Sequence, residues 1–240
     1  APRIRLRGAL KGLDTAPVTG EEFMQIAKHI LSKELMDDLH KFGSADFAYD
    51  YDEKTRFRVN IFQARGKLSC ACRLISSNIR KFDELYLPPI MAQIAMQPQG
   101  IVLLSGVTGS GKTTTLAAIV DRLNSERSHH IITVEDPVEH VHPRKKAMMS
   151  QREVGVTTKS FLTALKGSLR EDPDVIVVGE LRDVETVRMA VSAGETGHLV
   201  LGTMNTPNAA KAIERLIDLF PPGDQAQIRM TLAGALRLVV

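Results

Sequence analysis

Residues 106–113 read Gly106-Val107-Thr108-Gly109-Ser110-Gly111-Lys112-Thr113. This octet fits the phosphate-binding pattern G-x-x-x-x-G-K-[ST] at every position. It follows a short apolar run, Ile101–Ser105, and precedes a helical run, Thr114–Leu123, which is the strand–loop–helix context that the pattern requires. Its glycines let backbone N–H groups converge on phosphate oxygens at the positive end of the helix. We therefore expect Lys112 to reach the β- and γ-phosphates of a nucleotide and Thr113 to place its hydroxyl on Mg²⁺.

Two other short apolar strands end in acidic residues. Ile131–Val134 is followed by Glu135, and Val175–Val178 is followed by Gly179 and Glu180. Because ligands of parallel sheets lie beyond the carboxyl ends of the strands, both glutamates are expected beside the phosphates. One carboxylate can hold Mg²⁺ or its waters, and the other can orient and deprotonate the attacking water. Gly179 stands where an ordinary Walker B strand carries Asp, so this pattern is weak by itself.

Composition excludes several other classes of protein. The chain has 240 residues, of which 43% are hydrophobic and 25% charged, close to the average of globular domains. No apolar run approaches the roughly 18 residues needed to cross a bilayer. The net charge of +3 is too small to indicate a nucleic-acid partner, and the basic stretch 140–146 lacks interleaved aromatic residues. Cys70 and Cys72 form an isolated C-x-C, which is no zinc site and is consistent with a reducing cytoplasm.

The chain divides into two parts with different patterns. Residues 1–97 mix helix-like and strand-like segments, whereas residues 98–240 alternate short apolar strands with helices. The second pattern is typical of a mainly parallel sheet with both faces covered. Pro88-Pro89 and residues 97–100 mark the boundary. The prediction is therefore an α/β protein, in which a smaller α+β domain precedes a phosphate-binding domain.

Two alternating segments of the first part, 56–63 and 68–75, suit a β-hairpin with its turn centred on residues 65–66. That register places Arg58 directly opposite Arg73. Two opposed cations on a sheet repel by a few tenths of a kcal/mol or more, which an anion would offset. From the residues alone, an anionic ligand and two solvated arginines leaning apart both stay open.

Several motifs, all in the same order, resemble the PilT-like retraction ATPases of type IV pili, which belong to the secretion ATPase superfamily. These motifs are Val107–Thr115, Val134–His142, Gln151–Gly155, Leu169–Asp183 and Ala193–Val200. The resemblance extends from about Pro2 to Val240. It implies a PAS-like domain over residues 1–97, trimmed at its start, and a RecA-like ATPase domain over residues 98–240 that lacks the family's last helical part.

The resemblance also implies a role for each candidate residue. Glu180 takes the Walker B role and is the preferred general base, with Glu135 of the family's Asp box as the alternative. His198 belongs to the family's His box, which is thought to sense the γ-phosphate. Arg58 and Arg73 match two arginines of the N-terminal domain that approach the nucleotide.

The expected cofactors are ATP and Mg²⁺. Mg²⁺ would be held by Thr113 and Glu180, directly or through water, and catalysis would use Glu180, Glu135 and His198. The residues expected to bind nucleotide are Gly106, Val107, Thr108, Gly109, Ser110, Gly111, Lys112, Thr113, Thr114, Arg58 and Arg73.

The function that the resemblance implies is that of a Mg-ATP-hydrolysing motor for type IV pilus retraction and twitching motility. Family members form homo-hexamers at the cytoplasmic face of the bacterial inner membrane. There they contact a platform protein of that membrane, and no nucleic acid is expected as a partner. Extension and type II secretion ATPases of the superfamily carry a four-cysteine zinc insert, whereas residues 101–240 contain no cysteine, which disfavours extension.

One departure from the family keeps other functions open. Residues 203–206 read Thr-Met-Asn-Thr where retraction ATPases usually read Thr-Leu-His-Thr, so Asn205 replaces a histidine. A neutral amide donates hydrogen bonds but cannot carry a proton charge. The alternatives are an accessory retraction paralogue or a related type II/IV secretion ATPase, and, from another class, a weakly hydrolysing regulatory subunit that binds nucleotide. A nucleic-acid translocase has little support and would show DNA-stimulated turnover.

Overall fold

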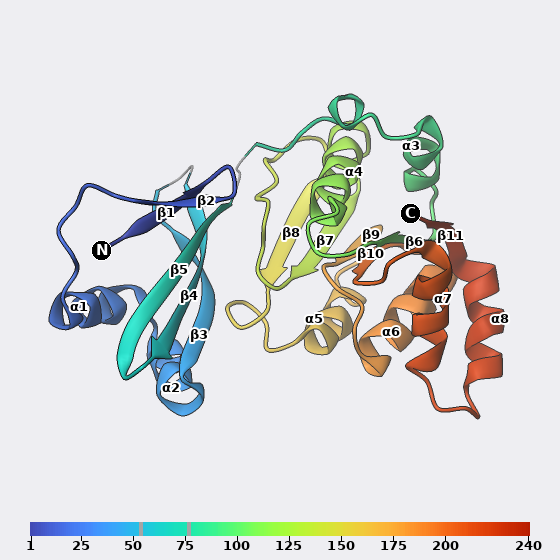
Figure 1. The fold of residues 1–240 in the computed structure, drawn as a ribbon. Coiled ribbons are helices and arrows are strands. Elements are labelled where there is room, and N and C mark those ends of the chain that lie inside the picture. Colours follow the sequence, from blue (N-terminus) through green and yellow to red (C-terminus); the bar gives the residue numbers. More distant parts are fainter. Residues whose placement is uncertain (53–54, 76–77) are drawn as a thin grey trace. The chain divides into compact units, whose positions relative to one another are not determined.

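A computed structural model describes residues 1–52, 55–75 and 78–240 and divides the chain into two compact units, Ala1–Ile75 and Ser76–Val240 (Figure 1). The predicted boundary after residue 97 is therefore wrong. The segment before it holds a 3₁₀ turn, η1 (Phe82–Leu85), and a helix, α3 (Pro89–Ala95). Both place buried apolar side chains, Phe82 and Met91 among them, in a core of the second unit. Hydrophobic packing assigns this segment to the second unit despite its prolines.

The first unit contains a three-stranded antiparallel sheet, a separate two-stranded hairpin and two helices. The sheet order is β3-β4-β5, and both helices contribute to one small core with it. A capping box at Thr19 starts the first helix, as the pair Thr19 and Glu22 predicts. The elements are β1 (Arg3–Leu6), β2 (Ala9–Gly12), α1 (Gly20–Ile30), α2 (Lys33–Phe42), β3 (Ser44–Asp50), β4 (Arg56–Ala64) and β5 (Lys67–Ile75).

The β4–β5 hairpin confirms the register predicted from the sequence. Its two-residue turn has φ of 52° at Arg65 and 72° at Gly66, and two positive φ values are what a type I′ turn requires. Arg58 lies directly opposite Arg73. The Arg58 guanidinium binds the carboxylate of Asp46 on β3, with Nη2 at 2.7 Å from Oδ2. An acidic side chain of the same sheet thus offsets part of the repulsion between the two arginines.

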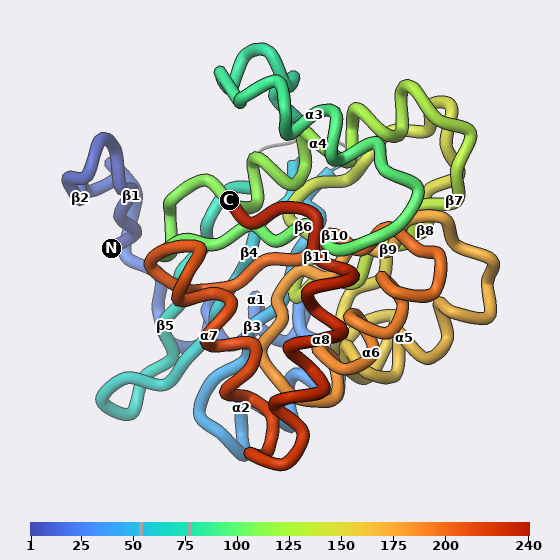
Figure 2. The backbone as a smooth tube through the Cα atoms, turned by 90° about the vertical axis from the view of Figure 1, so that its right-hand side faces the viewer, coloured from blue at the N-terminus to red at the C-terminus, as the bar shows by residue number. Residues whose placement is uncertain are grey.

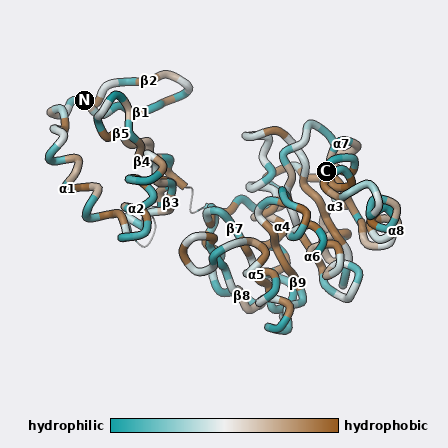
Figure 3. The backbone as a smooth tube through the Cα atoms, turned by 90° about the horizontal axis from the view of Figure 1, so that it is seen from below, coloured by the Kyte–Doolittle hydropathy of each residue, from teal (hydrophilic) through white to brown (hydrophobic). Residues whose placement is uncertain are grey.

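The second unit is built on a parallel sheet in the order β11-β6-β10-β9-β7-β8. Its central strands are mostly apolar and buried because helices cover both faces, and Figure 3 colours the strands around β9 as hydrophobic. The three apolar runs named above form β6, β7 and β9 as predicted, β10 lies between β6 and β9, and β8 and β11 are the edges. The strands are β6 (Gly100–Ser105), β7 (His130–Glu135), β8 (Met148–Glu153), β9 (Val175–Val178), β10 (Leu199–Met204) and β11 (Leu236–Val239).

Helices on the two faces of this sheet bury two separate cores. Residues of α4, α3 and η1 pack on one face, and residues of α5, α6, α7 and α8 pack on the other. Figure 2 shows α6 beside α8 at the second face, in agreement with Figure 1. The helices not yet given are α4 (Lys112–Glu126), α5 (Phe161–Ser168), α6 (Val184–Glu195), α7 (Ala209–Asp218) and α8 (Gln225–Ala235).

Candidate nucleotide site

The loop 106–111 connects the carboxyl end of β6 to the first turn of α4. Gly109 and Gly111 have φ of 83° and 100°, which only glycine adopts without strain, and Gly111 is the N-cap of the helix. Val107, Thr108 and Ser110 at the tip of the loop are exposed. The loop therefore presents the positive end of a 15-residue helix to solvent, which is a ready anion site.

Lys112 folds back over this loop. Its ammonium donates to the backbone carbonyls of Gly106 at 2.7 Å and Val107 at 3.0 Å, and to Oδ1 of Asn205 at 2.9 Å. All three acceptors lie at the carboxyl edge of the sheet, where β6 and β10 end side by side. The cation is thus held at the centre of the loop by protein acceptors.

Asn205 links this lysine to the acidic end of the next strand. Its Nδ2 donates to Oε1 of Glu180 at 3.1 Å, while its Oδ1 accepts from Lys112. Arg182 lies on the other side of Glu180, with Nη1 at 4.0 Å from Oε2, and also reaches Asp136 at 3.4 Å. A continuous chain therefore joins Lys112, Asn205, Glu180 and Arg182, and its members follow three different strands.

Gly179 has a steric reason to replace the usual Walker B aspartate. A Cβ atom at this position would lie 3.2 Å from the Cα of Glu135 and 3.3 Å from the carbonyl oxygen of Val134. Both neighbours are backbone of β7, which cannot move aside as a side chain could. The close approach of β9 and β7 therefore disfavours a side chain here, and the carboxylate at this strand end is that of Glu180, one residue later.

Glu135, at the end of β7, lies beside the first turn of α4. Its Oε1 accepts from the Thr133 hydroxyl at 2.7 Å and from Nε2 of Gln151 at 3.4 Å. Burial raises the pKa of the Glu135 carboxyl, and these hydrogen bonds oppose the shift. Glu135 and Thr113 both line a cavity of about 20 Å³ between β7 and α4, a volume that admits about one water molecule. The acidic side chain and the phosphate-binding helix thus meet, as predicted.

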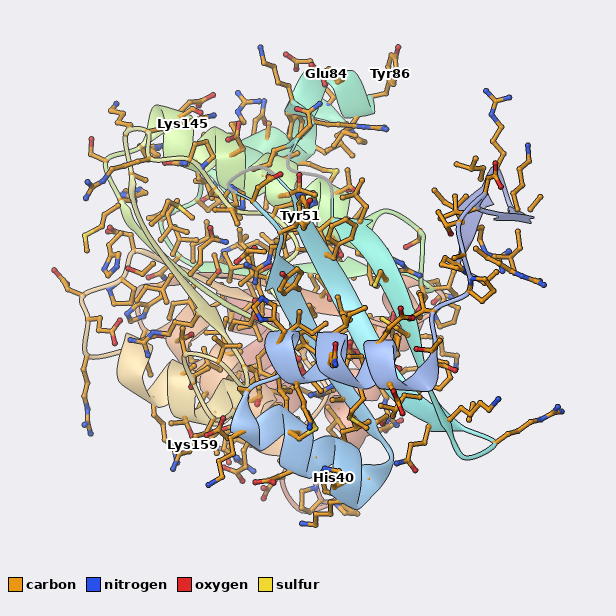
Figure 4. All side chains as sticks on the ribbon, turned by 90° about the vertical axis from the view of Figure 1, so that its left-hand side faces the viewer. His40, Tyr51, Glu84, Tyr86, Lys145 and Lys159 are labelled. Atoms are coloured by element: carbon orange, nitrogen blue, oxygen red, sulfur yellow. The ribbon has the colours of Figure 1, made fainter. Side chains whose placement is uncertain are left out.

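The loop between β7 and β8 is bonded to α4 and contributes to the lining of the small cavity that Glu135 and Thr113 share. Lys145, at the edge of α4 in Figure 4, donates to Asp121 at 2.6 Å and to Ser125 at 3.0 Å. His142 in the same loop is 9% exposed and lines the cavity, and its Nδ1 is buried without a hydrogen-bond partner within the described part of the chain. Burial lowers the pKa of this imidazole to about 4, so the ring is neutral at pH 7.

The structure does not place His198 at this site within the chain, so its position gives no support to the predicted role in sensing the γ-phosphate. It precedes the first residue of β10, where its carbonyl accepts from Gly100 at 3.0 Å and its Nδ1 lies 3.2 Å from the carbonyl of Ala193. Six residues of strand at about 3.3 Å each separate this amino edge from the phosphate-binding edge. At the carboxyl end of β10, next to the phosphate-binding loop, stands Asn205. The rule that ligands lie beyond the carboxyl ends of parallel strands, which predicted Glu135 and Glu180, would have selected Asn205 as well.

Arg58 and Arg73 lie on the first unit, so their relation to the loop is not part of the site described above. Arg182 is a site residue that sequence reasoning did not assign, since it stands in a helix-starting segment with two plausible roles. Over residues 1–52, 55–75 and 78–240 there is no group of three His, Cys, Asp or Glu side chains that could hold a metal ion by themselves. The helices of the described chain include none with the length and apolar character needed to span a bilayer.

Comparison with known proteins identifies the family. The family described as type II/IV secretion system protein matches residues 52–240. The type IV pilus retraction ATPase PilT of Pseudomonas aeruginosa is 41% identical over 239 residues, which are 100% of this chain and 70% of that protein. A twitching motility protein of Neisseria gonorrhoeae is 40% identical over 239 residues, all of this chain and 64% of that protein.

The fold agrees with the sequence comparison. A crystal structure of the pilus retraction motor PilT with bound ADP superimposes with a TM-score of 0.93 at 43% identity, covering 99% of this chain and 70% of that one. The chain therefore belongs to the type II/IV secretion system protein family, and it is a PilT-like member of that family.

Proposed function

We propose that this chain is the ATP-hydrolysing part of a motor that retracts type IV pili and so supports twitching motility. The observation that carries the proposal is the chain of contacts from Lys112 through Asn205 to Glu180 at the mouth of the phosphate-binding loop. Membership of the PilT-like family supplies the kind of work that the hydrolysis drives.

In the proposed reaction, water attacks the γ-phosphorus of ATP, the bond to the β–γ bridging oxygen breaks, and ADP and phosphate leave. The backbone N–H groups of residues 106–113 bind the phosphate oxygens, and Lys112 stabilises the negative charge that builds up on them. Glu180 takes the proton of the attacking water, with Glu135 as the alternative base. Asn205 orients the Glu180 carboxylate toward the loop, because its Oδ1 accepts from Lys112 while its Nδ2 donates to Glu180.

The oxygen donors at this edge suit Mg²⁺, a hard cation that prefers hydroxyl, carboxylate and water ligands. The Thr113 hydroxyl and the Glu180 carboxylate would hold it, Glu180 directly or through water. Bound there, it would neutralise charge on the β- and γ-phosphates.

The first unit is proposed to be a PAS-like domain that senses the nucleotide state. Arg58 and Arg73, opposed on neighbouring strands, would approach the phosphates from that domain, and loss of the γ-phosphate would then reposition one unit against the other. We further propose a homo-hexamer at the cytoplasmic face of the bacterial inner membrane, in peripheral contact with a platform protein and without nucleic acid.

A phosphate-release assay on the parent protein and on Lys112→Ala tests the proposal. The parent should hydrolyse ATP, and the variant should lose tight nucleotide binding because the cation at the loop centre is gone. Expression of the parent gene in a retraction mutant should restore twitching motility, whereas the Lys112→Ala gene should not. Unchanged nucleotide affinity in the variant would refute the site.

The arginines are tested separately. Replacing Arg58 and Arg73 together should reduce turnover with only a small change in the melting temperature, because Arg73 is exposed and Arg58 is partly exposed, in an ion pair with Asp46. Undiminished turnover would mean that Arg58 and Arg73 are solvated surface residues without a role in hydrolysis.

One observation favours a second candidate, a regulatory subunit that binds nucleotide and hydrolyses it weakly. Asn205 stands where the family resemblance leads us to expect a histidine, and an amide in contact with both Lys112 and Glu180 supplies no proton. The same assay separates the two functions, because a regulatory subunit would bind ATP tightly but release almost no phosphate.

A further inference from the structure

Thr133 and Glu135 project from the same face of β7, since side chains two residues apart in a strand share a face. The Thr133 hydroxyl donates to Oε1 of Glu135 at 2.7 Å, and Thr133 is fully buried. This hydroxyl is therefore shielded from water, and the carboxylate is its acceptor.

Gln151 supplies a second donor to the same oxygen. It lies on β8 directly beside Thr133 in the parallel register, and its Nε2 is 3.4 Å from Oε1 of Glu135. The same Nε2 donates to the carbonyl of His140 at 2.9 Å, and Oε1 of Gln151 accepts from the backbone N–H of His142 at 2.8 Å. Since every polar group of the amide is engaged, its orientation is set by the network.

The Glu135 carboxylate ends at a small cavity next to the phosphate-binding helix, so the direction of its side chain decides whether it can act there. Thr133 and Glu135 both line the small cavity whose opposite wall includes Thr113 in the first turn of α4. The backbone of Glu139 also donates to the carboxylate. A carboxylate so placed costs free energy unless donors satisfy it, and rotation about its side-chain bonds would take it away from the phosphate-binding helix.

We propose that Thr133 and Gln151 are positioning residues, which hold the Glu135 carboxylate at the wall of the Thr113 cavity in the geometry that ATP hydrolysis uses. The inference rests on the proposed function, because it concerns the same reaction. It adds Thr133 and Gln151 to the residues on which the reaction depends.

The test compares steady-state ATP hydrolysis by the parent and by Thr133→Val, Thr133→Ser and Gln151→Met. Valine and methionine keep the approximate shape and remove the donors, whereas serine keeps the hydroxyl. We expect Thr133→Val and Gln151→Met to lower kcat about ten-fold with KM for ATP within two-fold of the parent value. Thr133→Ser should retain kcat within about two-fold.

Thr186→Val is the matched control. Thr186 is also fully buried and donates its hydroxyl to a carboxylate, Asp183 Oδ2, at the same 2.7 Å, but at the start of α6. Thr186→Val removes this hydrogen bond, so it should lower the melting temperature about as much as Thr133→Val does and leave kcat unchanged. A fall in kcat as large as that of Thr133→Val would mean that general destabilisation explains both, and would overturn the inference.

The Glu135→Gln background separates positioning from other effects. If Thr133 and Gln151 act through the carboxylate, Thr133→Val and Gln151→Met should lower kcat no further once Glu135 is neutral. Full additional losses in that background, or unchanged kcat in both single variants, would overturn the inference while leaving the motor function in place. Absence of hydrolysis by the parent would instead overturn the proposed function and the inference with it.

Discussion

Acid should destabilise the second unit through His142, a buried imidazole in the wall of the nucleotide site. Burial lowers its pKa from the ordinary 6.5 to about 4. Asp121 opposes this shift, whereas His140 and Lys145 add to it. The folded state thus favours the neutral ring, while the unfolded chain takes up a proton below about pH 6.5. The stabilising contribution is fully present above that pH and is lost as the pH falls toward 4.

The size of the effect follows from the two pKa values. Between pH 7.5 and pH 5, proton uptake by the unfolded chain alone removes about 2 kcal/mol of unfolding free energy. For a unit of this size that is a fall in melting temperature of roughly 4–8 °C. Glu135 contributes with the opposite sign, because its raised pKa favours the folded state as the pH falls. The difference between the parent and a variant therefore isolates His142.

Calorimetry of the parent and His142→Asn at several values between pH 7.5 and pH 5 provides the measurement. The variant should be the less stable protein at pH 7.5, because packing is lost, and the gap should shrink by about 2 kcal/mol at pH 5. His40→Asn serves as the control, since His40 is exposed on α2 of the other unit (Figure 4). A gap that stays constant across this range would refute the assignment of a buried neutral ring.

Three further predictions concern the acidic edge of the sheet. Glu180→Gln should leave ATP bound but slow phosphate release by about 10² or more, as expected for loss of a general base, and wild-type turnover would transfer that role to Glu135. Gly179→Ala should lower the unfolding free energy, measured by urea denaturation, by about 1–3 kcal/mol, because the added Cβ meets the backbone of Glu135. Gly223→Ala is the control, since a Cβ at position 223 meets open space and should not lower the stability. Equal stabilities of the two variants would contradict the steric argument. Asn205→Ala should cut turnover roughly ten-fold, given the usual worth of hydrogen bonds to charged groups, and an unaffected rate would remove Asn205 from the site.

Local patterns were enough to predict the phosphate-binding loop and the β4–β5 hairpin. A loop of this kind depends on glycines and a lysine at fixed spacing within eight residues, and a two-residue turn sets the pairing of both strands. Arg58 opposite Arg73 therefore followed from counting outward from the turn. The acidic strand ends were equally predictable, since every strand of a parallel sheet carries its carboxyl end to one edge.

The carboxyl-end rule was not applied to His198, which precedes the first residue of β10. Resemblance to the His box outweighed the strand polarity that a residue count would have supplied. The domain boundary failed for a different reason. Prolines and glycines mark breaks in secondary structure, but Phe82 and Met91 belong to the second unit through contacts with α4 and the sheet that no local signal reports.

By itself, the amino-acid sequence determined that this protein has a phosphate-binding loop, two acidic strand ends and a hairpin with paired arginines, because each depends on neighbours within a few residues. Only the tertiary structure decided that Asn205 joins Lys112 to Glu180 and that Gln151 reaches Glu135 from the next strand. It also decided that the backbone of β7 crowds any side chain at position 179. Those relations depend on which strands lie side by side, and strand order is set by the packing of the whole sheet between its helices.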